Sequence, residues 1–162
     1  MAAPVKTKVL LVCMGNICRS PIAEGVLAKI LENSGLGNLV NVDSAGTHGF
    51  HAGEPPDPRA VAVAARHGYE IKSLRARKVR REDFSLFNLV LAMDRDNLAN
   101  LIESCPPVYQ SRVKLFLSYA RDIEFDEVPD PYYGGEAGFE AVLAMVEKAA
   151  HGLVEALRIE NP

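Results

Sequence analysis

The chain has 162 residues, 48% of them hydrophobic and 24% charged, with a formal net charge of −3. We expect a single folded domain that uses residues 1–162, with a core between about residues 7 and 158. The charge argues against a general nucleic-acid binder, and three cysteines, an odd number, argue against a disulfide scaffold and favour the cytoplasm.

The first predicted element is a β-strand at Val9–Val12, a short apolar run typical of a strand buried on both faces. The apolar run continues only to Met14, which is too short for a signal peptide or a membrane span. Ser20 suits the N-cap of a helix, and Pro21 suits the first helical position, where its missing N–H costs nothing. The sequence therefore predicts a strand, a short loop and a helix start.

The loop between this strand and helix is predicted to bind an anion. Its backbone N–H groups and the helix N-terminus converge on one point, and both favour negative charge. Gly15 and Asn16 tolerate the left-handed backbone conformation that such a nest needs. We expect the phosphate ligands to be residues 14–19.

Cys13 lies at the edge of this nest, where a helix N-terminus and a nearby cation favour the reactive thiolate form of a cysteine. Arg19 supplies a planar guanidinium that can hold two phosphoryl oxygens at once. The pattern predicts a phosphoryl-transfer site with Cys13 as nucleophile, and it requires no metal or cofactor. The alternative is a buried structural cysteine, with Arg19 paired to a surface carboxylate.

The next elements continue an alternating pattern. A helix is expected from Pro21 to about Ser34, ended by Gly35, and a second strand at Val40–Ser44. Residues 46–58 are rich in glycine and proline and form a loop. Asp57 and Pro58 then suit the cap and first turn of a second helix.

The segment after this helix is strongly basic. A solvated basic face is the simpler interpretation, and a docking surface for acidic partners is the alternative. Its cations are Arg75, Arg77, Lys78, Arg80 and Arg81.

Two further strands are predicted at Asn88–Met93 and Val113–Leu117. Asp94 can cap the helix between them, whose apolar stripe is Leu98, Leu101 and Ile102. A long helix then follows from Glu136 with a sustained period of 3.6 residues.

This order predicts an α/β fold, a four-stranded parallel sheet with helices on both faces, doubly wound and Rossmann-like. Cys13 would lie at the carboxyl end of the first strand, where such sheets bind ligands.

Asp130 is the candidate proton donor to a leaving group. Pro131 favours an extended backbone at Asp130, and the acidic neighbours Asp126 and Glu127 would help to keep its carboxyl protonated if they lie close in space. The alternative is an aspartate that serves only a turn.

Five motifs together resemble the low-molecular-weight protein tyrosine phosphatases and cover nearly the whole chain. The resemblance implies hydrolysis of phosphotyrosine and small aryl phosphates through a phospho-cysteine on Cys13, with Asp130 as general acid and then general base. The motifs are Val12–Pro21, Asp43–Thr47, Pro55–Asp57, Met93-Asp94 with Asn97, and Asp130–Gly134.

The resemblance also implies supporting roles. Asn16 would hold the loop backbone through side-chain hydrogen bonds, Ser20 would donate to the thiolate, and Ser44 would join their network. Many family members have a histidine at the position of Leu74, so its absence here leaves the end of the network unfilled unless His67 replaces it.

Phe50, Tyr132 and Tyr133 would border the substrate cleft by the same resemblance, and the two tyrosines would be open to phosphorylation. Cys18 would form a reversible disulfide with Cys13 under oxidants. For Phe50 the alternative is a partly buried anchor, and for Cys18 a small filler side chain.

The expected partners are a phosphotyrosine protein, for which bacterial members suggest a tyrosine kinase of polysaccharide export, and inorganic phosphate as product. Two other functions are considered, an arsenate reductase on the same fold and a non-catalytic phosphotyrosine-binding module. The first needs two more cysteines between residues 75 and 100, where there are none. A metal site is not expected, because His48 and His51 have no third ligand in register.

Overall fold

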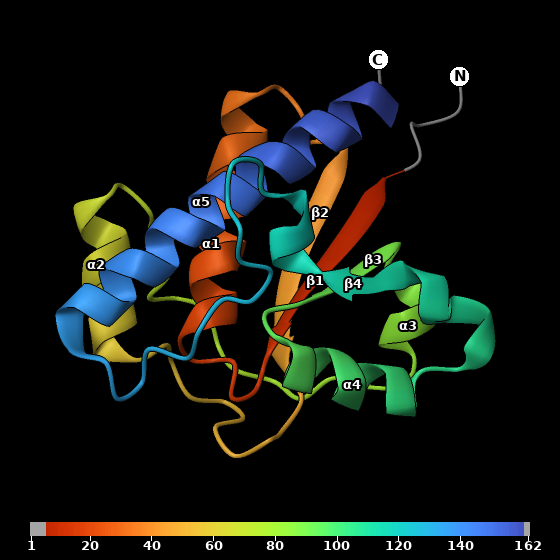
Figure 1. Cartoon of the computed structure of the whole chain (residues 1–162), viewed down its shortest axis with the longest axis horizontal. Coiled ribbons are helices and arrows are strands. Elements are labelled where there is room, and N and C mark those ends of the chain that lie inside the picture. The colour runs from red at the N-terminus through yellow and green to blue at the C-terminus, as the bar shows by residue number, and fades with distance from the viewer. Residues whose placement is uncertain (1–5, 161–162) are drawn as a thin grey trace.

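The protein forms a four-stranded parallel sheet in a computed structural model that describes residues 6–160; the predicted domain bounds 1–162 extend beyond this range. The strand order is β2-β1-β3-β4 (Figure 1). The strands are β1 (Thr7–Cys13), β2 (Val40–Gly46), β3 (Leu89–Ala92) and β4 (Val113–Leu115).

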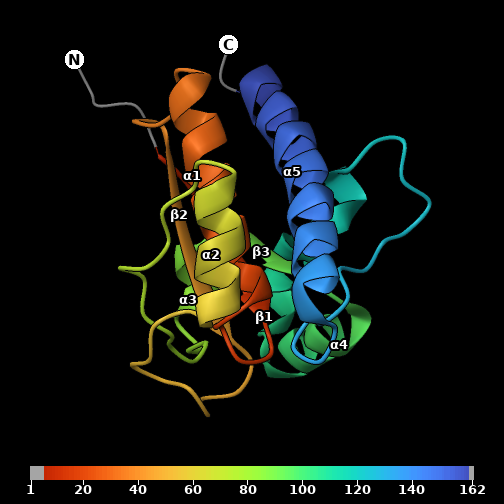
Figure 2. The same cartoon turned by 90° about the vertical axis from the view of Figure 1, so that its left-hand side faces the viewer.

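Helices cover both faces of the sheet, which confirms the predicted doubly wound α/β fold. α1 (Arg19–Asn33), α2 (Pro58–Arg66) and α5 (Gly135–Glu160) pack together on one face (Figures 1 and 2). α3 (Asp83–Leu86) and α4 (Arg95–Ser104) cover the other face.

The alternation of β1 explains this arrangement, because successive side chains of a strand point to opposite faces. Val9, Leu11 and Cys13 belong to the core beneath α1 and α5, whereas Leu10 and Val12 belong to the core beneath α3 and α4. A strand buried on both faces needs the continuous apolar run that the sequence shows.

Several element ends follow the predicted local signals. Asp57 caps α2 by accepting a hydrogen bond from the N–H of Arg59, and Asp94 caps α4 by accepting one from the N–H of Asn97. Gly35 follows α1 with a φ of 77°, a left-handed conformation that glycine adopts without steric cost.

Other predicted elements differ from the structure. β4 ends at Leu115 rather than Leu117, because residues Phe116–Tyr119 turn into a 3-10 helix that packs against α5. Ile102 was expected in the buried stripe of α4 but is 38% exposed, while Leu101 is buried. The short helix α3 and a second 3-10 helix at Pro107–Arg112 had no clear sequence signal.

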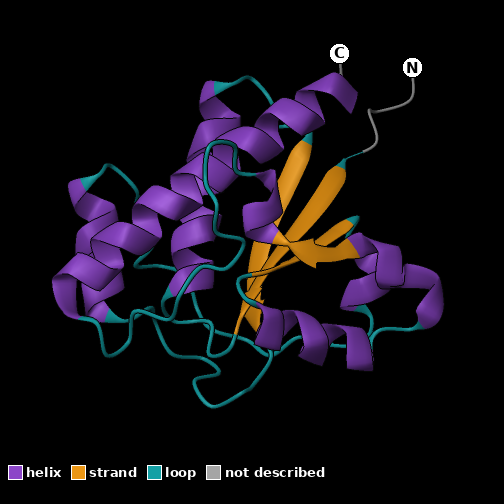
Figure 3. Ribbon diagram, viewed as in Figure 1, coloured by secondary structure: helices purple, strands orange, loops and turns teal. Residues whose placement is uncertain are grey.

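The topology places Cys13 at a switch point. The chain leaves β1 towards β2 on one side and later returns to β3 on the other side of β1. Diverging connections leave room for a ligand outside the carboxyl ends of the central strands. Figure 3 shows the loops that gather at this edge of the sheet.

Among the helices of residues 6–160, none has an uninterrupted apolar stretch of the length that a membrane span requires.

We predict that Gly152→Ala destabilises the protein by about 2 kcal/mol or more, because overpacking against rigid backbone cannot relax. A Cβ on Gly152 would lie 1.8 Å from the carbonyl oxygen of Tyr119 in the 3-10 helix. Urea unfolding measures the change. Gly138→Ala, in the same helix, is the matched control.

The nearest atom to a Cβ on Gly138 is 3.6 Å away, which is an ordinary contact. Because alanine has a higher helix propensity than glycine, Gly138→Ala should stabilise the protein by up to about 1 kcal/mol. Equal effects of the two substitutions would contradict the predicted clash.

Candidate active site

The loop of residues 14–18 joins β1 to α1 and surrounds the sulfur of Cys13. The N–H of Asn16 donates to Cys13 Sγ at 3.3 Å, and the hydroxyl of Ser20 lies 3.0 Å from the same sulfur. Cys13 is only 3% exposed. Asn16 has a φ of 58°, the left-handed conformation expected for the loop.

The helix start differs from the prediction. α1 begins at Arg19 with Cys18 in the N-cap position, and no side chain caps it. Ser20 therefore lies within the first turn, and its hydroxyl is turned back to Cys13. Among the described residues, the N–H groups of Gly15, Ile17, Cys18 and Arg19 have no hydrogen-bond partner within the protein. Such uncapped donors at a helix start form an anion-binding nest.

A buried network of side chains holds the loop in place. The Asn16 side-chain amide donates to Ser20 Oγ at 2.7 Å and to Ser44 Oγ at 3.0 Å. Its oxygen accepts from the N–H of Arg77 at 3.0 Å. The structure thus brings together the three residues assigned supporting roles and joins the loop to β2 and to the basic segment.

Glu24 ends this network and was missed by the sequence analysis. Ser44 Oγ donates to Glu24 Oε1 at 2.6 Å. The available signal was an acidic residue among the buried apolar positions of α1. Leu74 packs against the apolar core, and His67 pairs with Glu140 on α5, so neither side chain takes part in the network.

Burial raises the pKa of the Glu24 carboxyl to about 7, although the hydrogen bond from Ser44 opposes the shift. Asp43 raises the pKa further, and Arg77 lowers it. A carboxyl group in this position carries its charge at a cost.

Arg19 is held by one side chain and one backbone carbonyl from distant parts of the chain. Its guanidinium donates to Asp94 Oδ2 at 2.6 Å and to the carbonyl oxygen of Val128 at 3.0 Å. Asp94 therefore caps α4 with one oxygen and orients Arg19 with the other, a role that the sequence did not indicate. Burial opposes the charge of Arg19, but the negative charges of Cys13, Asp94 and Asp130 raise its pKa above the usual value.

Asp130 faces this guanidinium across the pocket, with Oδ2 4.0 Å from an Arg19 nitrogen. Its other oxygen accepts a hydrogen bond from the N–H of Tyr132 at 3.0 Å. The expected neighbours Asp126 and Glu127 instead bind Arg95 on α4, so their charges are compensated there.

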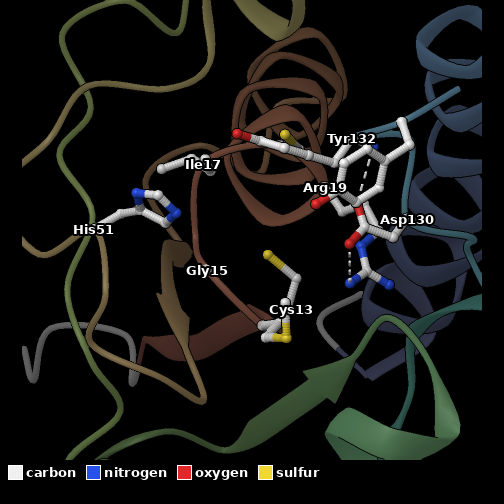
Figure 4. Close-up of a pocket in the computed structure, with 10 residues that line it drawn as sticks. Cys13, Gly15, Ile17, Arg19, His51, Asp130 and Tyr132 are labelled. Atoms are coloured by element: carbon white, nitrogen blue, oxygen red, sulfur yellow. Dashed lines mark hydrogen bonds and ion pairs between the residues drawn. The ribbon is translucent and has the colours of Figure 1, made fainter. Parts of the chain in front are cut away.

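These groups line a pocket of about 250 Å³ at the carboxyl end of β1. Figure 4 shows Cys13 at its base, His51 on one side, and Asp130 and Tyr132 on the other. The pocket is lined by Cys13, Met14, Gly15, Ile17, Cys18, Arg19, His51, Asp130, Tyr132 and Tyr133.

One predicted pocket residue lies elsewhere. Phe50 is 75% exposed, stacks on His48 with ring centroids 5.1 Å apart, and does not line the pocket. The neighbouring His51 takes that side of the opening and pairs with Glu54. The side chain of Asn16 points behind the loop into the buried network.

Cys18 lines the pocket but differs from Cys13 in its surroundings. Burial, together with the negative charges of Asp57, Cys13 and Asp130, raises the pKa of the Cys18 thiol to about 12. Cys18 is therefore almost entirely protonated at neutral pH, which makes its sulfur a poor nucleophile. All three cysteines are free thiols, and Cys105 lies in the core on the other face of the sheet.

Known proteins resemble this chain along nearly its full length. A family model described as low molecular weight phosphotyrosine protein phosphatase matches residues 8–162. A low molecular weight protein-tyrosine-phosphatase of Streptomyces coelicolor is 47% identical over 154 residues, which cover 93% of each chain.

Solved structures have the same fold. A protein tyrosine phosphatase from Entamoeba histolytica, with Hepes in its active site, has a TM-score of 0.93 at 39% identity and covers 97% of this chain and 100% of its own. Wzb of Vibrio vulnificus, in complex with benzylphosphonate, has a TM-score of 0.81 at 27% identity over 93% and 98% of the two chains.

We predict that Glu24→Gln stabilises the protein at alkaline pH. Because the folded-state pKa of about 7 lies above the ordinary value of 4.5, the stabilising contribution of Glu24 is complete below about pH 4.5 and is lost as the pH rises through 7. The variant should exceed the parent in stability by roughly 3 kcal/mol above about pH 8, and the difference should vanish towards pH 4.5.

Urea unfolding across this pH range is the measurement, and Glu32→Gln on the exposed face of the same helix is the control. A difference between Glu24→Gln and the parent that is independent of pH would contradict the assignment.

Proposed function

The chain belongs to the low-molecular-weight phosphotyrosine protein phosphatase family, and we propose that it hydrolyses phosphotyrosine through a phospho-cysteine intermediate on Cys13. The observation that carries this proposal is the convergence of three groups on one pocket. Cys13 Sγ lies at its base, four unpartnered N–H groups and Arg19 surround it, and Asp130 lies at its opening.

In the first step, Cys13 Sγ attacks the phosphorus atom and forms an S–P bond while the P–O bond to the tyrosyl oxygen breaks. The electron pair of that bond passes to the tyrosyl oxygen, which takes the proton of Asp130. The loop N–H groups and the Arg19 guanidinium bind the three other phosphoryl oxygens, where negative charge is concentrated.

In the second step, the Asp130 carboxylate takes a proton from a water molecule, whose oxygen attacks phosphorus. The S–P bond breaks, its electron pair returns to sulfur, and inorganic phosphate leaves. The Ser20 hydroxyl, 3.0 Å from Cys13 Sγ, donates a hydrogen bond to the departing sulfur. Asn16 and Ser44 keep Ser20 and the loop in position.

The pocket walls favour an aryl phosphate. Tyr132 and His51 present rings on opposite sides of the opening, and Ile17 adds an apolar surface. Because Cys13 is almost fully buried, the phosphoryl group must enter on a stem long enough to reach the base, which suits phosphotyrosine better than phosphoserine.

The alternatives are less well supported. An arsenate reductase would relay a disulfide through further cysteines, but Cys105 belongs to the core on the opposite face of the sheet. A non-catalytic phosphotyrosine-binding module would need neither a thiol at the base of the pocket nor a carboxyl group at its opening.

We infer that residues 1–162 act as a single catalytic domain in the cytoplasm, where a reactive thiol stays reduced. The proposed substrate is a phosphotyrosine protein, and a bacterial tyrosine kinase is one candidate. The protective disulfide between Cys13 and Cys18 and the phosphorylation of Tyr132 and Tyr133 stay predictions.

We expect Cys13→Ser to abolish hydrolysis of a small aryl phosphate, with a loss of at least about 10³-fold, because the nucleophile and its bond to phosphorus are removed. The assay is run with EDTA present. Rapid acid quench of the parent enzyme should trap phosphate on Cys13, detected by mass spectrometry. Cys105→Ser is the matched control and should stay active. Equal rates for Cys13→Ser and the parent would overturn the mechanism, and inactivity of both would favour a binding module.

We expect Asp130→Asn to lower kcat by about 10²–10⁴-fold for phenyl phosphate, while inhibition by inorganic phosphate changes little. The loss should be smaller for p-nitrophenyl phosphate, whose leaving group needs less protonation. Asp126→Asn is the control, because it removes a carboxylate from the same loop, one that binds Arg95. An equal loss with both substrates would remove Asp130 from the role of general acid.

A further inference from the structure

A second concavity, of about 310 Å³, is bordered by Thr47 after β2, by the basic segment and by α3 and α4. Three cations, Lys78, Arg80 and Arg81, line one of its walls. Asn100 and Ser104 of α4 line another and supply polar groups.

The floor of the concavity is apolar and fixed. Phe84 of α3 and Leu101 of α4 are each 1% exposed and belong to the core beneath these helices. A charged side chain that enters the concavity can therefore lay its aliphatic part on a rigid surface while its head group meets the cations.

The positive charge of this wall is not neutralised within the described part of the chain. Neither Lys78 nor Arg81 has an ion-pair partner there, and Arg80 has only Glu82, at 3.7 Å on an exposed side chain. None of the residues that line the concavity is acidic.

The two remaining cations of the segment behave differently. Arg77, which we expected in a solvated basic face, is half-buried and forms ion pairs with Asp43 and Asp83. Arg75 donates to backbone carbonyl groups of its own turn. The segment thus divides into two structural arginines and three cations that face the concavity.

The backbone fixes this surface relative to the catalytic pocket. The N–H of Gly46 donates to the carbonyl of Arg77, and the N–H of Val79 donates to the carbonyl of Gly46. Thr47 lines the concavity, and His51, four residues later, lines the catalytic pocket. Thr47 and His51 are therefore at most about 14 Å apart along the backbone. An extended substrate peptide covers this distance in about four residues.

We propose that the concavity walled by Lys78, Arg80 and Arg81 binds aspartate or glutamate side chains three to five residues from the phosphotyrosine of a protein substrate. The inference rests on the proposed function and adds a substrate class to it, phosphotyrosine followed or preceded by an acidic cluster. The chain as a whole is acidic, with a net charge of −3, so this local positive surface distinguishes one approach of the substrate from others.

The test compares kcat/KM for phosphotyrosine peptides of equal length that carry either three Glu or three Gln residues, placed three to five positions before or after the phosphotyrosine. At low salt the Glu peptide of one of the two series should be favoured by about 3- to 10-fold, as expected for a few exposed ion pairs. The preference should shrink towards one at about 0.5 M salt.

The variant Lys78→Glu/Arg81→Glu should lower the ratio of kcat/KM for the Glu peptide to kcat/KM for the Gln peptide to one or below. Because both peptides undergo the same reaction, this ratio cancels any change in the chemical step. Arg121→Glu/Lys148→Glu makes the same change of charge beside α5, on the other face of the sheet, and should keep the preference.

A ratio near one in the parent enzyme would overturn the docking surface. A preference for the Glu peptide that persists in Lys78→Glu/Arg81→Glu would also overturn it. Hydrolysis of the Gln peptides and of an aryl phosphate would meanwhile leave the proposed function standing. Hydrolysis of no phosphorylated compound would overturn both.

Discussion

The structure depends on a loop that must close a turn while four N–H groups of residues 15–19 stay without a partner among the described residues. Backbone groups of a buried loop normally pair, and an unpaired donor is costly. Here the turn is stabilised by Asn16, which adopts a left-handed conformation and whose side-chain amide donates hydrogen bonds to Ser20 and Ser44. The loop is therefore held by the side chain of Asn16, which leaves the N–H groups of Gly15, Ile17, Cys18 and Arg19 free of partners among the described residues.

This constraint also decides where charge is placed. A cation as deeply buried as Arg19 is stable only with compensating partners, and Asp94 supplies one at 2.6 Å while Asp130 lies 4.0 Å away. The closer carboxylate fixes the guanidinium, and the more distant one stays 44% exposed at the opening of the pocket, the position that the proposed general acid requires. One arginine thus contacts both a structural aspartate and the aspartate that we propose as general acid.

Local patterns sufficed to predict the parts of the fold that local physics governs. The apolar run of β1, the caps Asp57 and Asp94 and the left-handed Gly35 all act within a few residues, and the alternation of strands and helices limits the topology to a few choices. Cys13 and Arg19 were also within reach, because a strand end and a helix start converge whatever the remainder of the fold.

The incorrect expectations have two causes. Some involve partners distant in sequence, and one applied the capping preference of serine to a helix start that stays uncapped. Asp126 and Glu127 bind Arg95, and Arg77 binds Asp43, pairings that no local pattern encodes. Phe50 and His51 are neighbours in an irregular loop, where small backbone rotations decide which ring enters the pocket. Ser20 does not cap the helix, for a physical reason: a capping side chain would occupy the donors that an anion needs.

Hydrogen bonds also link the pocket to the basic surface beside it. Residues 77–79 bind Asn16 through one N–H and the end of β2 through two further hydrogen bonds, so a single backbone segment positions both the nucleophile loop and the wall of cations. Their separation is set by hydrogen bonds rather than by a flexible linker, and a rigid separation can discriminate between substrates by spacing as well as by charge.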